Sequence, residues 1–357
     1  MAGLYVHIPF CKKRCLYCDF FSTTLLNRRA EYVDAILIEI KERKNEIHEP
    51  IRTVYLGGGT PSTLDINDIT RILNAVDAPD TEEITMELNP GDATFEYIRA
   101  LRQIGINRLS IGVQSFQDEL LQCIGRRHTA QQAIEAVRIA QEAGFDNLSI
   151  DLMYALPNQT MAQWQADIRT AIQLGVQHIS SYGLMYEPGT VLTQQLESGQ
   201  LTAMDEDEEM TMYDILCEQL KHAGFVHYEV SNFALPGYEA KHNSNYWNGT
   251  PYVGIGAGAH SYTGNVRSWN PDDLDAYIRG IVAHDLQRES ETLTETDIYN
   301  ERIMLGLRTK HGVPKEWIQT DISTHVEAEL LREDHGRVIA TQEGLHILNR
   351  IIEDLMI

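Results

Sequence analysis

Three cysteines lie close together near the start of the chain, at Cys11, Cys15 and Cys18, in the spacing Cys-x3-Cys-x2-Cys. Three thiolates in one loop can hold a metal ion or an iron–sulfur cluster, because each sulfur needs only a short reach to a common centre. Three thiolates are one short of the usual four-sulfur set, so one coordination position is left open for reactive chemistry. A structural zinc site is the alternative, and it needs a fourth ligand such as His7 or a distant residue.

Further glycine-rich and polar positions follow apolar runs later in the chain. A turn from Gly57 to Thr60 follows the run 53–56, and Glu87, Gln114 and Asp151 lie near the ends of three more runs. Glycine lets backbone carbonyls approach a ligand closely, and a carboxylate can accept hydrogen bonds from ribose hydroxyls. A tight turn and ordinary strand-end caps are the simpler explanations of the same residues.

Short apolar strands alternate with helices through the first half of the chain and position these residues. The hydrophobic pattern predicts strands at 4–8, 53–56, 84–88, 108–113, 148–153 and 178–184, and helices at 31–47, 66–76, 94–104, 129–143 and 162–174. The helix at 129–143 has the clearest signals, a capping box between Thr129 and Gln132 and a terminating Gly144. Such alternation predicts parallel βαβ units.

These units predict an α/β fold, a partial (β/α)6 barrel of the TIM type over residues 1–235. In a parallel barrel the carboxyl ends of all strands open on one face, so the cysteines, the glycine turn and the carboxylates are expected at one rim. A doubly wound sheet is the alternative. The alternation stops after residue 190, and residues 236–357 are expected to form a small α+β C-terminal domain. Its predicted elements are helical structure from about residue 289, a short hairpin at 338–342 and a final helix at 343–356.

The composition argues against several classes of protein. Twenty-nine basic and 52 acidic residues give a formal charge of −23, and so negative a surface repels phosphate backbones, which argues against nucleic acid as a partner. The chain has neither an apolar run long enough to span a membrane nor a signal-peptide pattern. We therefore expect a soluble cytoplasmic protein. Cys123 and Cys217 are isolated, so the five cysteines do not indicate a disulfide framework.

The cysteine motif, on a loop after the first strand of a βα series, resembles that of the radical S-adenosylmethionine (SAM) superfamily. The resemblance implies that Cys11, Cys15 and Cys18 bind three irons of a [4Fe-4S] cluster and that SAM chelates the fourth iron. It also implies that the reduced cluster cleaves SAM to a 5′-deoxyadenosyl radical. The same resemblance places a further set of residues in contact with SAM: Tyr5, Gly58, Gly59, Thr60, Glu87, Gln114, Arg126 and Asp151.

Longer segments narrow the resemblance to one subfamily, the oxygen-independent coproporphyrinogen III dehydrogenases and their relatives. The matching segments are 5–11, 57–61, 112–115 and 151–157. The dehydrogenases have a fourth cysteine where this chain has Phe20, and a substantial segment before the cysteines where this chain has ten residues. Both departures favour the HemW group of heme chaperones, which keep the radical SAM scaffold but bind heme for delivery to hemoproteins.

A segment in the second half of the chain supports that choice. The sequence His242-Asn-Ser-Asn-Tyr-Trp247 resembles the His-Asn-x-x-Tyr-Trp motif of the heme chaperones. The resemblance makes His242 a candidate iron ligand, because histidine ligates heme iron, and Tyr246 and Trp247 could stack on the porphyrin. A hydrogen-bonded loop packed on the barrel is the alternative interpretation, and His260 is a second candidate ligand.

The sequence therefore predicts a heme chaperone with three cofactors: a [4Fe-4S] cluster, SAM and heme. No catalytic residue is assigned. The expected partners are hemoproteins that accept heme, among them membrane respiratory proteins such as cytochromes. A second copy of the chain, forming a homodimer, is a further possible partner. The competing hypothesis is an enzyme, either oxygen-independent coproporphyrinogen III dehydrogenase or another radical SAM enzyme that acts on tetrapyrroles.

Overall fold

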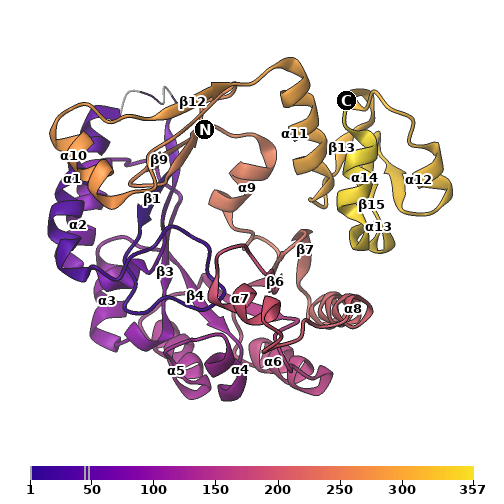
Figure 1. Ribbon diagram of the computed structural model, residues 1–357, viewed down its shortest axis with the longest axis horizontal. Coiled ribbons are helices and arrows are strands. Elements are labelled where there is room, and N and C mark those ends of the chain that lie inside the picture. Colours follow the sequence, from indigo (N-terminus) through magenta and orange to yellow (C-terminus); the bar gives the residue numbers. More distant parts are fainter. Residues whose placement is uncertain (1, 44–45, 47–48) are drawn as a thin grey trace.

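One curved sheet organises the first three quarters of the chain (Figure 1). The computed structural model describes residues 2–357 except 44–45 and 47–48. Six central strands run parallel and lie in chain order: β1 (Ala2–Ile8), β2 (Ile51–Gly58), β3 (Glu83–Leu88), β4 (Arg108–Gln114), β5 (Leu148–Tyr154) and β6 (His178–Gly183). A doubly wound sheet reverses its strand order at the centre. The predicted partial barrel is therefore confirmed, and the doubly wound alternative is wrong.

Helices cover the outer face of these strands because alternate strand residues are apolar. In β1, for example, Leu4, Val6 and Ile8 are buried in a core shared with the helices. The covering helices are α1 (Arg29–Arg43), α2 (Ile66–Val76), α3 (Phe95–Gln103), α5 (Ala130–Glu142), α6 (Met161–Gln173) and α8 (Glu206–His222). The capping box between Thr129 and Gln132 is confirmed. The last predicted residues of the first helix, near 47, lie partly outside the described residues.

The sheet continues past both sides of the parallel strands. Beyond β6 lie β8 (Asn232–Ala234) and β7 (Val226–Glu229), both in antiparallel pairings. Beyond β1 lie β9 (Tyr252–Ile255), β10 (His260–Tyr262), β11 (Val266–Trp269) and β12 (Glu289–Thr292). The helix α10 (Leu274–Val282) packs in the same core. Residues 252–282 therefore share the core of the barrel, while the division at residue 235 stays a prediction about domains.

A separate core holds the C-terminal unit together, with Ile303, Leu307 and Ile351 at its centre. Its elements are α11 (Glu295–Leu307), β13 (Val313–Pro314), α12 (Ser323–Glu327), β14 (Leu331–Asp334), β15 (Arg337–Ala340), α13 (Gln342–His346) and α14 (Leu348–Leu355). In Figure 1 this unit lies at the opposite end of the molecule from α1 and α2.

Three predictions for the second half of the chain are wrong in detail. Residues 289–292 form the exposed strand β12 rather than helix, because they pair with β11 and need no apolar pattern. The hairpin partner of β15 is β14, whereas Thr341 caps α13 with its side chain. The final helix is broken at Ile347 into α13 and α14.

The segment around His242 is helical. It forms α9 (Lys241–Asn248), which ends at Gly249 with a φ of 71°. The interpretation of this segment as a loop is therefore wrong. Figure 1 shows α9 between the sheet and α11, and it packs against β1 and β2 on one side and α11 on the other. Residues 241–248 thus pack between the barrel and the C-terminal unit.

Candidate functional site

The cysteine loop leaves the end of β1 and is tied back to it by backbone hydrogen bonds. Cys11 N–H donates to Thr23 O at 2.8 Å, and Thr23 N–H donates to Pro9 O at 2.7 Å. Cys11 is buried, and Cys15 and Cys18 are partly exposed. Burial raises the pKa of the Cys11 thiol, and burial raises that of Cys18 to about 11, with a further increase from the neighbouring cysteines. The three thiols are thus close enough to influence one another's charge.

The donor set of this loop fits an iron–sulfur cluster. Cationic Arg126 donates from Nη1 to Cys15 Sγ at 3.2 Å, and Arg126 and Arg14 both favour the thiolate of Cys11. Across the described part of the chain, no three His, Cys, Asp or Glu side chains are grouped as ligands of a single metal ion. A cubane cluster binds each thiolate at a different iron. The assignment of the three cysteines as cluster ligands stays a prediction.

The glycine turn packs directly on the end of β1. A Cβ on Gly58, whose φ is 112°, would lie 2.5 Å from the His7 ring, and one on Gly59 would lie 2.7 Å from the backbone of Pro9. Glycine is needed at both positions because a side chain has no room there. Thr60 Oγ1 lies 3.4 Å from Cys11 Sγ. The turn and the cysteine loop therefore meet, as the sequence predicted for one rim of a barrel.

Glu87 lies beside this turn at the end of β3. Its carboxylate accepts hydrogen bonds from Tyr55 Oη at 2.9 Å and from Gly58 N–H at 3.1 Å. Burial raises the pKa of Glu87 to about 7, although the hydrogen bond from Tyr55 opposes the shift; the negative charge of Asp151 raises it further. The carboxyl groups of Glu87 and Asp151 are therefore close enough for the charge of one to affect the pKa of the other.

Asp151 shares the rim with Arg126. The Ser110 hydroxyl donates to the Asp151 carboxylate at 3.3 Å. Burial raises the pKa of Asp151 to about 6, against the opposing effects of Ser110, Arg108 and Arg126. Arg126 also donates to the carbonyl of Gly112. Two acidic groups and one arginine are thus available for a ligand with hydroxyl and carboxylate groups.

Gln114 and Tyr5 complete the predicted set. Gln114 is buried at the end of β4 with a φ of 69°, and its side chain lies with that of Arg126 over Gly112. Tyr5 hydrogen-bonds to His7 Nδ1 at 2.9 Å and lies 6.1 Å from Tyr55, measured between ring centroids. All eight predicted SAM contacts and the three cysteines therefore lie at or just below the carboxyl ends of β1 to β5. Their contact with SAM stays a prediction.

His242 is buried, and both of its ring nitrogens have partners. Nδ1 lies 2.9 Å from Thr53 Oγ1 and Nε2 lies 2.9 Å from Tyr246 Oη, while the ring stacks on Tyr55. Burial and the positive charge of Arg108 lower its pKa to about 3. The ring is therefore neutral and inward-facing, and it must give up the bond to Tyr246 before Nε2 can bind iron. His260, the second candidate, is exposed and stacks on Trp269.

The inner face of the partial barrel is polar, a feature not predicted above. Polar residues alternate with the apolar residues of each strand, and this period of two was the available signal. The inward residues are Tyr5, His7, Thr53, Tyr55, Thr85, Glu87, Arg108, Ser110, Ser149, Asp151, His178, Ser180 and Tyr182. Arg108 is among them and is almost fully buried, although its Nε has no hydrogen-bond partner among the described residues.

Two cavities lie on either side of α9. The smaller, of about 370 Å³, borders the barrel interior and is lined by Tyr5, Tyr55, Tyr182 and His242 among others. The larger, of about 780 Å³, lies between α9 and the C-terminal unit. Tyr246 and Trp247 line both cavities. The helix that carries the predicted heme motif is therefore the wall between them.

Comparisons with known proteins show the family of this chain. The family model described as the radical SAM superfamily matches residues 5–171. The chain is 36% identical to the heme chaperone HemW of Lactococcus lactis subsp. lactis over 370 residues, which cover 99% of this chain and 97% of that relative. This chain belongs to the HemW family of radical SAM proteins. Membership in the radical SAM superfamily implies a [4Fe-4S] cluster and SAM as cofactors.

Two more relatives and one solved structure extend the comparison. HemW of Synechocystis sp. is 38% identical over 88% of this chain and 79% of its own length. The mitochondrial radical S-adenosyl methionine domain-containing protein 1 of Bos taurus is 32% identical over 99% of this chain and 87% of its own length. The radical SAM enzyme coproporphyrinogen III oxidase (HemN) of Escherichia coli matches with a TM-score of 0.84 at 22% identity, over 99% of this chain and 90% of HemN. At that identity the likeness shows the shared fold.

Length and hydropathy together rule out a helical membrane span anywhere in the described residues of this HemW-family chain. The cytoplasmic location expected from the sequence stays a prediction.

Proposed function

We propose that this protein is a heme chaperone that binds a [4Fe-4S] cluster, SAM and heme and passes heme to hemoproteins. The observation that carries the proposal is similarity over nearly the whole chain to relatives named heme chaperone HemW. Phe20 supports the same choice. It stands where the resembling dehydrogenases have a fourth cysteine, and its side chain is 64% exposed beside the cluster loop.

The rim of the barrel supplies the groups that two of the cofactors need. Cys11, Cys15 and Cys18 hold three irons of the cluster, and the bound cluster with SAM supplies one-electron and radical chemistry. The glycine turn offers backbone carbonyls to the amino group of SAM. Glu87 and Asp151 accept hydrogen bonds from hydroxyl groups of its adenosyl part, and Arg126 pairs with its carboxylate.

Heme acceptors complete the proposed cycle. Respiratory cytochromes are the acceptors we favour, and the cytoplasm is the place where heme is loaded. The chain contributes binding and release of heme, and no residue is assigned to a chemical step on the porphyrin.

Delivery can be separated from passive loss of heme. The anaerobically reconstituted protein is loaded with hemin and mixed with a b-type apocytochrome, and the transfer rate is compared with loss of heme to excess apomyoglobin. A chaperone gives a transfer rate that rises with apocytochrome concentration and exceeds the loss to apomyoglobin. Equal rates with both acceptors contradict the proposed function.

The enzymatic alternative is tested on the same preparation. The protein with cluster and SAM is incubated anaerobically with coproporphyrinogen III and a reductant, and tetrapyrroles are separated by chromatography. We expect no protoporphyrinogen IX. If protoporphyrinogen IX forms over many turnovers, the protein is a dehydrogenase and the chaperone proposal is wrong.

A further inference from the structure

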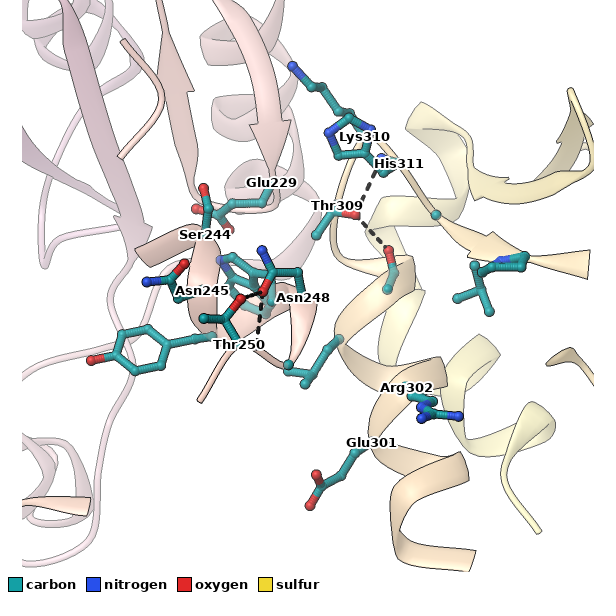
Figure 2. Close-up of a pocket in the computed structure, with 18 of the residues that line it drawn as sticks. Glu229, Ser244, Asn245, Asn248, Thr250, Glu301, Arg302, Thr309, Lys310 and His311 are labelled. Carbon is teal, nitrogen blue, oxygen red and sulfur yellow. Dashed lines mark hydrogen bonds between the residues drawn. The ribbon is translucent and has the colours of Figure 1, made fainter. Parts of the chain in front are cut away.

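The larger of the two cavities has the size of a cofactor site. It has a volume of about 780 Å³, within the roughly 300–1,000 Å³ that small-molecule and cofactor pockets occupy. Figure 2 shows its two walls: Ser244, Asn245 and Asn248 on α9 lie on one side, and Arg302, Thr309 and His311 lie on the other. The cavity is thus formed only where the barrel meets the C-terminal unit.

The walls offer flat apolar surface on both sides. Tyr246 and Trp247 line the cavity from α9, and Trp317 lines it from the turn after β13. Trp317 is 44% exposed, so part of its ring is accessible to a ligand in the cavity. Aromatic side chains on opposite sides suit a large planar ring system.

The cations of the cavity differ in whether a carboxylate already neutralises them. Arg267 pairs with Glu301 at 2.9 Å, and Lys310 pairs with Glu239 at 3.1 Å. Arg302 has no carboxylate partner among the described residues, and its guanidinium lies 4.9 Å from the centroid of the Trp317 ring. Arg302 is therefore free to pair with an acidic group of a ligand that stacks near Trp317.

Among the described residues that line this cavity, His311 is the sole histidine. Its ring makes no hydrogen bond in the part of the chain that the structure describes, unlike the ring of His242. Burial lowers the pKa of His311, and the positive charges of Lys310 and Arg337 lower it further. A neutral imidazole with a free nitrogen lone pair is the form that binds iron.

The loop that carries His311 is held in place by its neighbours. Thr309 Oγ1 accepts the backbone N–H of His311 at 3.3 Å, and Arg337 donates to the carbonyls of His311 and Gly312. Gly312 has a φ of 58°, and a Cβ there would collide with the carbonyl oxygen of Val338. The position of His311 at the cavity edge is therefore built into the packing of the C-terminal unit.

We propose that heme binds in this cavity between α9 and α11, with His311 as the axial ligand of its iron and Arg302 paired with one of its propionates. This inference rests on the proposed function and deepens it, because it names the heme site. It assigns the iron ligand to His311 of the C-terminal unit instead of His242. Trp247 and Trp317 then contact the porphyrin.

The ligand is tested by titrating the full-length protein and its His311→Ala variant with hemin and following the Soret band. Because His311 is exposed, the variant is expected to fold, and circular dichroism confirms this. We expect the histidine-ligated spectrum to be lost and hemin affinity to fall by roughly tenfold or more. Added imidazole should restore the spectrum. His222→Ala removes an exposed histidine at the end of α8 that lines neither cavity, and it should behave as the unaltered protein.

The propionate contact has its own test. Arg302→Glu should weaken hemin binding but leave the binding of hemin dimethyl ester nearly unchanged, whereas Arg138→Glu on the outer surface of α5 should alter neither. If His311→Ala retains the wild-type spectrum and affinity, the proposed ligand is wrong. That outcome leaves the proposed function standing. The proposed function fails on different results: the unaltered protein binds no hemin, transfers heme no faster to apocytochrome than to apomyoglobin, or forms protoporphyrinogen IX.

Discussion

The imidazole Nε2 of His242 lies 2.9 Å from the hydroxyl of Tyr246, one helical turn further along α9. Residues four apart share one face of a helix, which explains the spacing of the two aromatic residues in the motif. The other nitrogen of His242 lies 2.9 Å from Thr53 Oγ1 inside the barrel. His242 therefore anchors the wall that separates the two cavities.

We predict that Tyr246→Phe destabilises the protein by about 1–3 kcal/mol, because it leaves Nε2 of a buried histidine without a partner. Chemical denaturation followed by circular dichroism measures the change. Tyr262→Phe is the matched control, since it removes a hydroxyl whose acceptor, Gly264 O, is exposed to solvent. If the free energy of unfolding falls equally in both variants, the hydrogen bond to His242 does not stabilise the protein more than an exposed hydrogen bond does.

Cys15→Ser should abolish binding of the cluster. Its Sγ is one of three thiols in the loop and the one that Arg126 contacts, and serine is a poor iron ligand. Iron content and visible absorption after anaerobic reconstitution provide the measurement. Cys123→Ser, an isolated and partly exposed cysteine on α4 (Asp118–Cys123), should retain the full iron content. A Cys15→Ser protein with unchanged iron would remove Cys15 from the ligand set.

Gly58→Ala should destabilise the glycine turn by more than 1 kcal/mol and reduce cluster loading. The new methyl group would meet the His7 ring and would also force a φ of 112° on an alanine, so overpacking adds to backbone strain. Gly199→Ala is the control, because its φ of 70° brings strain but no atom lies within 4 Å. Thermal unfolding and iron content should both distinguish the two variants, and identical behaviour would contradict the packing argument.

The buried carboxylates predict how the stability of the cofactor-free protein depends on pH. The pKa of Glu87 rises from 4.5 to about 7 on folding, and that of Asp151 rises from 3.8 to about 6. At a pH between the unfolded and the folded pKa of each carboxyl group, the folded chain keeps a proton that the unfolded chain has released. The free energy of unfolding therefore falls as pH increases from about 4 to 7. Above pH 7 both carboxyls are ionised in both states and the decline ends.

Glu87→Gln should remove much of that slope between pH 5 and 7. The free energy of unfolding should therefore fall less between pH 5 and pH 7.5 in this variant than in the unaltered protein. Urea denaturation at several pH values measures it. Glu135→Gln, an exposed glutamate on α5, should leave the slope unchanged. A slope that survives in Glu87→Gln would assign the pH dependence to other groups.

The local features of this protein follow from the order of its residues alone. The spacing of Cys11, Cys15 and Cys18 and the chain order of β1 to β6 could be predicted, because spacing and hydrophobic period depend only on near neighbours. The glycine turn and the strand-end residues Glu87 and Asp151 could be placed at one rim for the same reason. The polar lining of the barrel was also present in the sequence, as a period of two within each strand.

The way in which α9 and the C-terminal unit face each other depends on long-range packing. The orientation of His242 depends on Thr53 and Tyr55, which come from a strand nearly two hundred positions earlier in the chain. His311 has no motif around it, and its importance appears only when α11 and β15 place it at a cavity lined by Trp247. A cavity is defined by the gap between packed elements, and no local pattern of residues fixes the size of that gap.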